Sequence, residues 1–236
     1  MLQHNVVNIL YAIKLRVELH LDKSREGCFC GDDEALADAR YSLKKIYDFA
    51  NRAIEITRKI GGLMRVCDDS GDAGSTAHVR ECWRQAVRRL KVHHGLDPIE
   101  VIEHVPPDFP RVRCAAPDLQ AAFYALAENA LQAMKGGGKL ILRASLQWGR
   151  EDMPMAVLSV SDTGPGVPVK HLNALFDPFF STRGEESGNG LGLCLVKGLV
   201  RRNEGSVSAS SFVGCGSTFT MLFRTAEECL QTLESK

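Results

Sequence analysis

The chain has 236 residues, 44% hydrophobic and 25% charged, which is ordinary for a soluble globular protein and enough for one large or two small domains. Its 29 basic and 29 acidic side chains cancel, so no global positive field favours nucleic-acid binding. No apolar run approaches the roughly 18 residues of a membrane helix, and the first residues lack signal-peptide order. We therefore expect a cytoplasmic protein without a membrane segment or a nucleic-acid partner.

Eight cysteines raise the question of disulfides or a metal site. Six of them are scattered, several inside apolar segments, which is typical of buried free thiols. Cys28 and Cys30 form the single cluster, in a predicted bend. A redox or metal role for this pair stays open as the minor alternative.

Two helices are predicted at the N-terminus, over residues 1–23 and from about residue 33 to residue 66. In the second helix, apolar residues follow a 3-4 heptad from Leu36 to Met64, which is typical of a helical bundle. Two helices alone bury too little surface, so residues 1–66 are expected to form a homodimeric four-helix bundle. His4 and Asn8 lie four residues apart and share a face of the first helix.

A polar linker is predicted over residues 67–76, followed by a mixed domain over residues 77–224 and a short helix or tail over 225–236. Within the domain we expect helices over about 77–94 and from Pro117, and strands at 99–105, 111–115, 139–147, 155–161 and 217–223. The run Lys135–Lys139 contains three glycines but no following Ser or Thr, so it is interpreted as a helix-to-strand turn and not as a Walker loop.

The stretch 157–200 has the features of a ligand site. Apolar residues alternate into Asp162, and Gly164 and Gly166 follow at once, allowing a ligand close to the main chain. A short helical segment over 167–175, a phenylalanine cluster and a polar flap over 181–189 come next. Gly190 and Gly192 then open an apolar helix, whose free backbone N–H groups suit a phosphate.

These segments resemble the nucleotide site of the histidine-kinase branch of the GHKL ATPases, the superfamily of gyrase, Hsp90, histidine kinases and MutL. Four boxes occur in the family's order: LQAAFYALAENALQAM resembles the asparagine box, DTGPG the first glycine box, FDPFFSTR the phenylalanine box and GNGLGL the second glycine box. GCGSTF resembles a third glycine box. The resemblance implies an α+β protein, in which an N-terminal helical hairpin precedes an α/β sandwich of the GHKL (Bergerat) type.

The resemblance also implies the roles of single residues, with ATP and Mg²⁺ as cofactors. Asp162 is expected to accept a hydrogen bond from the adenine amino group, with Ser217 supporting it through water, and Asn129 to coordinate Mg²⁺. Arg183 matches the basic end of the phenylalanine box and either reaches the phosphates or is solvated. The remaining expected nucleotide-site residues are Gly164, Gly166, Phe180, Gly188, Gly190, Leu191 and Gly192, although the phenylalanines are expected to pack the lid rather than touch ligand.

Position 125 departs from the family pattern. Related kinases often carry Asn there, and the mechanical ATPases carry a catalytic Glu, whereas this chain has Ala125. This argues against a gyrase-like or Hsp90-like ATPase. Glu128 points to another face of the helix and is assigned no role.

The first helix, with HNVVNILYAIKLRVEL, resembles the phosphoacceptor box of sensor kinases of the HDFNNLL type. The resemblance implies that His4 accepts phosphate, that Asn5 replaces the acidic residue of the family, and that Asn8 orients a water for dephosphorylation. The expected function is ATP-dependent autophosphorylation of His4 and transfer to a response-regulator aspartate. The alternative is a dimeric nucleotide-binding relay or phosphatase module with little autokinase activity, because Asn5 carries no charge. An upstream sensor segment is expected to have been cut away or to be naturally absent.

Overall fold

The computed structural model describes residues 13, 15, 17–18, 41, 43–44, 46–47, 74–94, 98–134, 136–149, 153–181 and 190–226. The chain divides into two compact units, Met1–Met64 and Arg65–Lys236. In the first unit all described residues are helical, and the Tyr47 hydroxyl donates a hydrogen bond to Glu18 Oε1 at 3.5 Å. The rest of the two predicted N-terminal helices lies outside the described residues.

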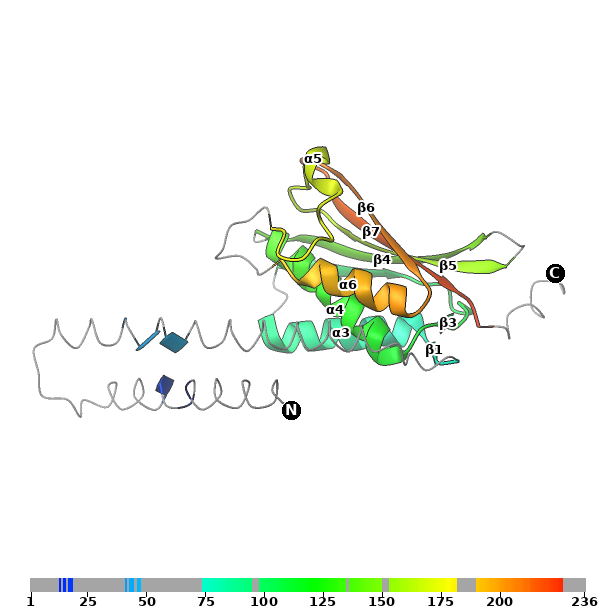
Figure 1. The fold of residues 1–236 in the computed structure, drawn as a ribbon, viewed down its shortest axis with the longest axis horizontal. Helices are drawn as coiled ribbons and strands as arrows, with labels where there is room; N and C mark the ends of the chain where they lie inside the picture. The colour runs from blue at the N-terminus through cyan, green and yellow to red at the C-terminus, as the bar shows by residue number, and fades with distance from the viewer. Residues whose placement is uncertain are drawn as a thin grey trace, which may run out of the picture. The chain divides into compact units, whose positions relative to one another are not determined.

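The second unit is built on a five-stranded sheet in the order β2-β4-β5-β7-β6 (Figure 1). β2 pairs with β4 in parallel, and the other pairs are antiparallel. The strands are β2 (Ile99–His104), β4 (Gly138–Trp148), β5 (Pro154–Asp162), β6 (Ser206–Phe212) and β7 (Gly216–Arg224). A separate two-stranded sheet joins β1 (Thr76–Ala77) to β3 (Val112–Arg113).

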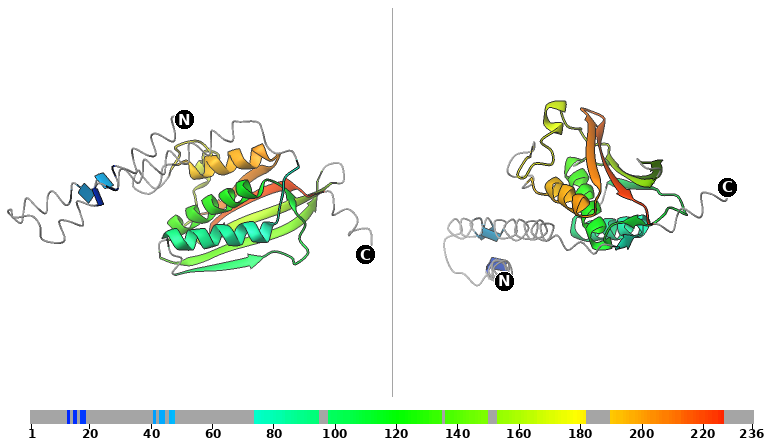
Figure 2. Two further views of the ribbon diagram at one scale, coloured as in Figure 1. Left: turned by 90° about the horizontal axis from the view of Figure 1, so that it is seen from below. Right: turned by 45° about the vertical axis from the view of Figure 1, so that its right-hand side comes forward.

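Three helices cover one face of this sheet: α3 (Val79–His94), α4 (Ala116–Ala133) and α6 (Gly192–Arg202) (Figure 2). α4 lies in the middle and contacts both α3 and α6. The short helix α5 (Val169–Leu172) lies beside β6. The result is a two-layer α/β sandwich, as the sequence predicted.

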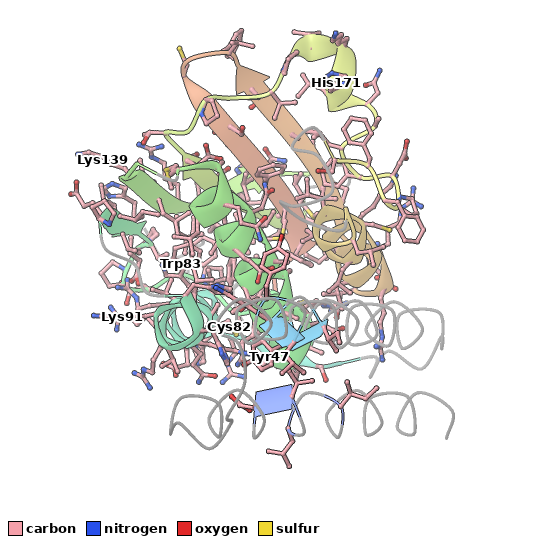
Figure 3. The ribbon with its side chains drawn as sticks, turned by 90° about the vertical axis from the view of Figure 1, so that its left-hand side faces the viewer. Tyr47, Cys82, Trp83, Lys91, Lys139 and His171 are labelled. Atoms are coloured by element: carbon pink, nitrogen blue, oxygen red, sulfur yellow. The ribbon has the colours of Figure 1, made fainter. Side chains whose placement is uncertain are left out.

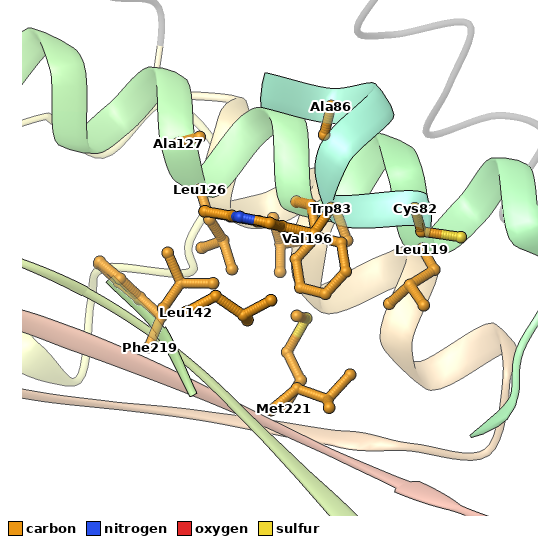
Figure 4. Packing of buried hydrophobic residues seen from close by; sticks show 14 of the residues in the cluster. Cys82, Trp83, Ala86, Leu119, Leu126, Ala127, Leu142, Val196, Phe219 and Met221 are labelled. Atoms are coloured by element: carbon orange, nitrogen blue, oxygen red, sulfur yellow. The ribbon is translucent and has the colours of Figure 1, made fainter. Parts of the chain in front are cut away.

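The core lies between the helices and the sheet because the strands alternate buried and half-buried residues with period two. In β5 the residues that share a face with Leu158 and Asp162 are buried. α3 contributes Trp83, which is 1% exposed and meets the Phe123 ring of α4 edge-on with centroids 5.4 Å apart. Figure 4 shows Trp83 above Met221, between the helices and the strands. Such aromatic pairs stabilise a core by about 0.5–1.5 kcal/mol beyond the area they bury.

Four elements differ from the sequence-based prediction. β1 forms at Thr76–Ala77, where the end of the linker and the start of a helix were predicted. β6 was not predicted, because its sequence SVSASSF is mostly serine and buries only Ser211; it forms because β7 offers a full-length partner strand. The helix predicted over 167–175 is reduced to α5, followed by turns. The strand predicted over 111–115 is only two residues long.

The folded region also continues past residue 224. Thr225 bridges to Val112 and its hydroxyl donates to the Pro154 carbonyl at 3.1 Å, while the Ala226 N–H donates to the Arg111 carbonyl at 2.9 Å. Among the described residues, no helix combines the length and hydropathy that a membrane span requires.

Candidate functional site

Asp162 ends β5 with a buried carboxylate, 6% exposed. Its Oδ1 accepts hydrogen bonds from two backbone N–H groups, those of Gly164 at 2.9 Å and Ser217 at 3.3 Å. Ser217 lies directly opposite Asp162 in the β5–β7 register. Burial of a charged group is costly unless hydrogen bonds compensate it, and these two amides orient the carboxylate.

The glycines after Asp162 allow the chain to turn tightly at this point. A Cβ at Gly164 would lie 2.8 Å from Asp162 Oδ1. Gly166 has φ +72°, and a Cβ there would collide with the Phe212 carbonyl oxygen of the β6–β7 turn. The loop 163–167 therefore packs backbone to backbone against that turn, which requires residues without a side chain.

The C-terminal end of α4 packs against the loop 163–167 that follows Asp162. A Cβ at Gly164 would lie 3.2 Å from Ala133, so the helix end is in contact with the loop. The Lys139 N–H donates to Thr163 Oγ1 at 2.9 Å, which ties the start of β4 to the end of β5. Asn129 is half-buried on α4, one turn before Ala133. The position expected to bind a metal is thus one helical turn from the loop that holds Asp162.

The N-terminus of α6 has no side-chain cap. Its N-cap residue, Leu191, makes no side-chain capping hydrogen bond, and the first turn contains no acidic residue, whereas Arg201 and Arg202 occupy the last turn. The first N–H groups of a helix have no intrahelical acceptor and carry a partial positive charge. In the part of the chain that the structure describes, nothing lies within 4 Å of a Cβ built on Gly192. This helix end therefore has the features of an anion site.

Cys194, in the first turn of α6, does not add negative charge there. Burial raises the pKa of its thiol, the nearby Lys197 lowers that pKa, and Asp177 raises it. The net direction is upward, so the side chain is a neutral thiol near pH 7. The partial positive charge at the helix N-terminus therefore comes from the backbone N–H groups.

The phenylalanine cluster packs mainly against protein. The Phe176 ring meets Phe219 edge-on at 6.4 Å, and Phe180 lies 5.6 Å from the His171 ring of α5 (His171 is labelled in Figure 3). Phe179 differs, with 72% of its surface exposed and φ +65°. Its N–H donates to the Gly190 carbonyl at 3.1 Å, which connects the cluster to the start of α6. Leu191 is 1% exposed, so its side chain belongs to the interior.

The structure brings part of the expected site together at one end of the sheet. Asp162, Gly164 and Ser217 are in direct contact, Gly166 packs against Phe212, and the N-terminus of α6 lies at the same end of the domain (Figure 1). Ser217 reaches Asp162 through its backbone amide, while its hydroxyl contacts Ser211 Oγ at 3.1 Å. The expected residues that lie outside the described part of the chain are His4, Asn5, Asn8, Arg183 and Gly188.

Two residues near the site were not found from the sequence. Ser211 is buried and its hydroxyl contacts the Val167 N–H, the Gly216 carbonyl and the Ser217 hydroxyl, while its serine-rich surroundings give no signal. Glu128 is 7% exposed; its Oε1 lies 3.3 Å from His94 Nε2 and accepts from the Tyr124 hydroxyl at 3.4 Å. The four-residue spacing of Tyr124 and Glu128 on one helix face was the available signal.

The polar side chains around Asp162 and Asn129 suit a hard cation whose other ligands are water and phosphate oxygens. Among the described residues, no group of three or more His, Cys, Asp or Glu side chains is placed to hold a metal. Asn129 supplies a neutral amide oxygen, and Mg²⁺ typically keeps several waters and binds phosphate oxygens beside one or two protein ligands. The residues therefore fit Mg²⁺ that arrives with a phosphate ligand.

Comparison with known proteins supports the resemblance to the histidine kinases. Residues 114–227 match the family model of the histidine kinase-, DNA gyrase B-, and HSP90-like ATPases. The sensor kinase CckA of Brucella abortus is 30% identical over 238 residues, covering 95% of this chain and 24% of that protein. The sensory histidine kinase/phosphatase NtrB of Rhodobacter capsulatus is 33% identical over 174 residues, covering 68% of this chain and 48% of that protein. The chain thus spans less than half the length of each relative.

Solved structures share the fold. The full-length kinase ShkA, solved in complex with AMPPNP, superposes with a TM-score of 0.64 at 20% identity, covering 94% of this chain and 46% of that one. The Acinetobacter baumannii histidine kinase AdeS superposes with a TM-score of 0.60 at 18% identity, covering 95% of this chain and 97% of that one.

Proposed function

We propose that the chain catalyses ATP-dependent phosphorylation of a protein histidine. The premise is that residues 114–227 form a domain of the histidine kinase-, DNA gyrase B-, and HSP90-like ATPase family and that the chain is a histidine kinase core. In this proposal the γ-phosphoryl group of ATP passes to His4 and then to an aspartate on the receiver domain of a response regulator. Catalysis consists mainly of positioning and electrostatic stabilisation.

The observation that carries the proposal is the buried Asp162 carboxylate at the same end of the domain as the uncapped N-terminus of α6. A fixed hydrogen-bond acceptor suits the adenine amino group, and the helix N-terminus suits the phosphates. Asn129 is the proposed Mg²⁺ ligand, and the metal would neutralise charge on the transferred phosphoryl group. Arg183 and Gly188 belong to the proposed lid.

The N-terminal unit supplies the phosphoacceptor in this proposal. Residues 1–66 form a helical hairpin that dimerises, residues 67–76 link it to the ATP-binding domain at 77–224, and His4 is the nucleophile. Sequence similarity to CckA extends over 95% of the chain, which supports treating both parts as one kinase core.

A second candidate is a phosphatase or relay with weak autokinase activity. It is favoured by Asn5, which is uncharged where the resembled family has a carboxylate that takes up the proton of the attacking histidine. General-base assistance of this kind contributes about 10²–10⁴-fold in rate. Asn8 is intact, and NtrB is named both kinase and phosphatase.

The test is incubation with γ-labelled ATP and Mg²⁺, followed by measurement of acid-labile, base-stable label. The proposal expects label that His4→Ala abolishes. Asp162→Ala should weaken ATP binding in calorimetry by about 5- to 150-fold, from the loss of one to three kcal/mol of buried hydrogen bonding. Asp108→Ala, at an exposed turn, is the matched control. Unchanged ATP affinity in Asp162→Ala would reject the site.

A tenfold rise in label for Asn5→Asp would favour the second candidate. Equal rates in the two proteins, both in the normal kinase range and both abolished by His4→Ala, would place the chain with the ordinary kinases.

A further inference from the structure

Ser211, near the end of β6, has a buried hydroxyl with three partners. It donates to the Gly216 carbonyl at 2.7 Å, accepts the Val167 N–H at 2.7 Å and lies 3.1 Å from Ser217 Oγ. A serine hydroxyl has one proton and two acceptor sites. Since its proton goes to Gly216, the Ser217 hydroxyl must donate to Ser211, and every direction in this small network is fixed.

The three partners belong to two segments of the chain. Val167 follows the glycine loop that begins after Asp162, whereas Gly216 and Ser217 begin β7. A second bond joins the same two segments, from the Gly214 N–H to the Pro165 carbonyl at 2.8 Å. Ser211 therefore holds the glycine loop against the β6–β7 turn by a buried side chain.

Two backbone donors to Asp162 Oδ1 come from the segments that Ser211 joins. One is the Gly164 N–H, three residues before Val167, and the other is the Ser217 N–H. A shift of the loop relative to the turn would change one of these two distances and let the carboxylate rotate. The orientation of Asp162 thus depends on the hydroxyl of Ser211.

We propose that Ser211 is a positioning residue for purine selection, acting through the two amides that fix Asp162. The inference rests on the proposed function, in which Asp162 receives the base. Adenine presents an amino donor at the edge where guanine presents a carbonyl acceptor, so a fixed carboxylate accepts from adenine and repels guanine. A carboxylate that can turn away loses part of this discrimination, while contacts to the phosphates at α6 are unaffected.

The experiment compares dissociation constants for ATP and GTP on the full chain by calorimetry at one Mg²⁺ concentration. Ser211→Ala is expected to reduce the preference for ATP over GTP at least fivefold, chiefly by weakening ATP. Ser211→Thr, which keeps the hydroxyl, is expected to retain the wild-type preference for ATP. Ser210→Ala is the matched control, because Ser210 is the exposed neighbour in the same strand. Thermal melting of each variant without nucleotide monitors the fold.

Equal loss of ATP and GTP affinity in Ser211→Ala would overturn the inference, because it would show a purely structural role. An unchanged ATP:GTP ratio, or a wild-type chain that binds the two nucleotides equally, would also overturn it and leave ATP binding standing. A wild-type chain that binds neither nucleotide would overturn the proposed function itself. If Ser211→Ala does not fold, Ser211→Cys, of similar shape and weaker hydrogen bonding, carries the same comparison and the same outcomes.

Discussion

Substituting Gly192 by alanine is expected to change stability and nucleotide affinity in opposite directions. Gly192 is the first residue of α6, and nothing described lies within 4 Å of a Cβ built there. Replacing a glycine by alanine where the backbone is compatible stabilises a protein by about 0.4–1 kcal/mol, mainly by restricting the unfolded chain. For a protein of this size that corresponds to a rise in melting temperature of about 1–4 °C.

The same methyl group occupies the space into which phosphates must come in the proposed site. Overpacking of this kind costs about 1–3 kcal/mol, which corresponds to about a 5- to 150-fold increase in the dissociation constant for ATP. Calorimetric melting without nucleotide and titration with ATP and Mg²⁺ measure the two effects on one preparation. The expected variant is more heat-stable than wild type and binds ATP more weakly.

Two other glycines serve as controls. Gly136 also has open space around its Cβ position but lies in an exposed turn, so Gly136→Ala should not lose ATP affinity. Gly190 has φ +63°, and its Cβ would collide with the Phe179 backbone, so Gly190→Ala should lower the melting temperature without nucleotide. A Gly192→Ala protein that melts below wild type, or that binds ATP equally well, would refute the reasoning.

Native alkylation with iodoacetamide at pH 8, mapped by mass spectrometry, should label exposed Cys215 and spare the buried thiols Cys82 and Cys114. Early labelling of Cys114 would contradict its burial. Burial raises the pKa of the Cys114 thiol far above its ordinary 9.0. The protonated thiol therefore contributes stability that is fully present below pH 9 and is lost as the pH rises further. Above pH 9, the urea midpoint should fall less in Cys114→Ala than in wild type. Glu128→Gln should lower the free energy of unfolding by up to about 1 kcal/mol, because it weakens the contact of the buried Glu128 carboxylate with the partly exposed His94 ring. Equal urea midpoints in variant and wild type would show this contact to be unimportant.

The parts of the fold that the sequence predicted well are those whose burial alternates in the sequence itself. The run into Asp162 alternates apolar and polar residues, and β5 covers Pro154–Asp162 where 155–161 was predicted. α4 begins at Ala116, one residue before the predicted start at Pro117. In both elements the residue pattern and the tertiary environment favour the same structure, so local reasoning was sufficient.

The parts that were missed depend on partners distant in sequence. β6 consists largely of serines, and no local preference distinguishes it from a loop; its pairing with β7 decides its structure. The role of Ser211 follows from contacts with Val167, 44 residues earlier in the chain. Glu128 was correctly placed on a different face from Asn129, but only the packing of α3 on α4 shows that this face is buried beside His94.

The pairing of Asp162 with Ser217 also constrains how the domain folds. These residues are 55 positions apart, and the glycine loop, the phenylalanine cluster, α6 and β6 all lie in the loop between them. The carboxylate acquires its second amide donor only when this loop closes, and closure of long loops is a slow, late event compared with the formation of local hairpins such as β4–β5. During synthesis, a chain that has not yet emerged beyond residue 217 lacks that donor. In the proposed function, adenine binding requires this closed loop, so nucleotide would stabilise the finished domain over its partly folded precursors.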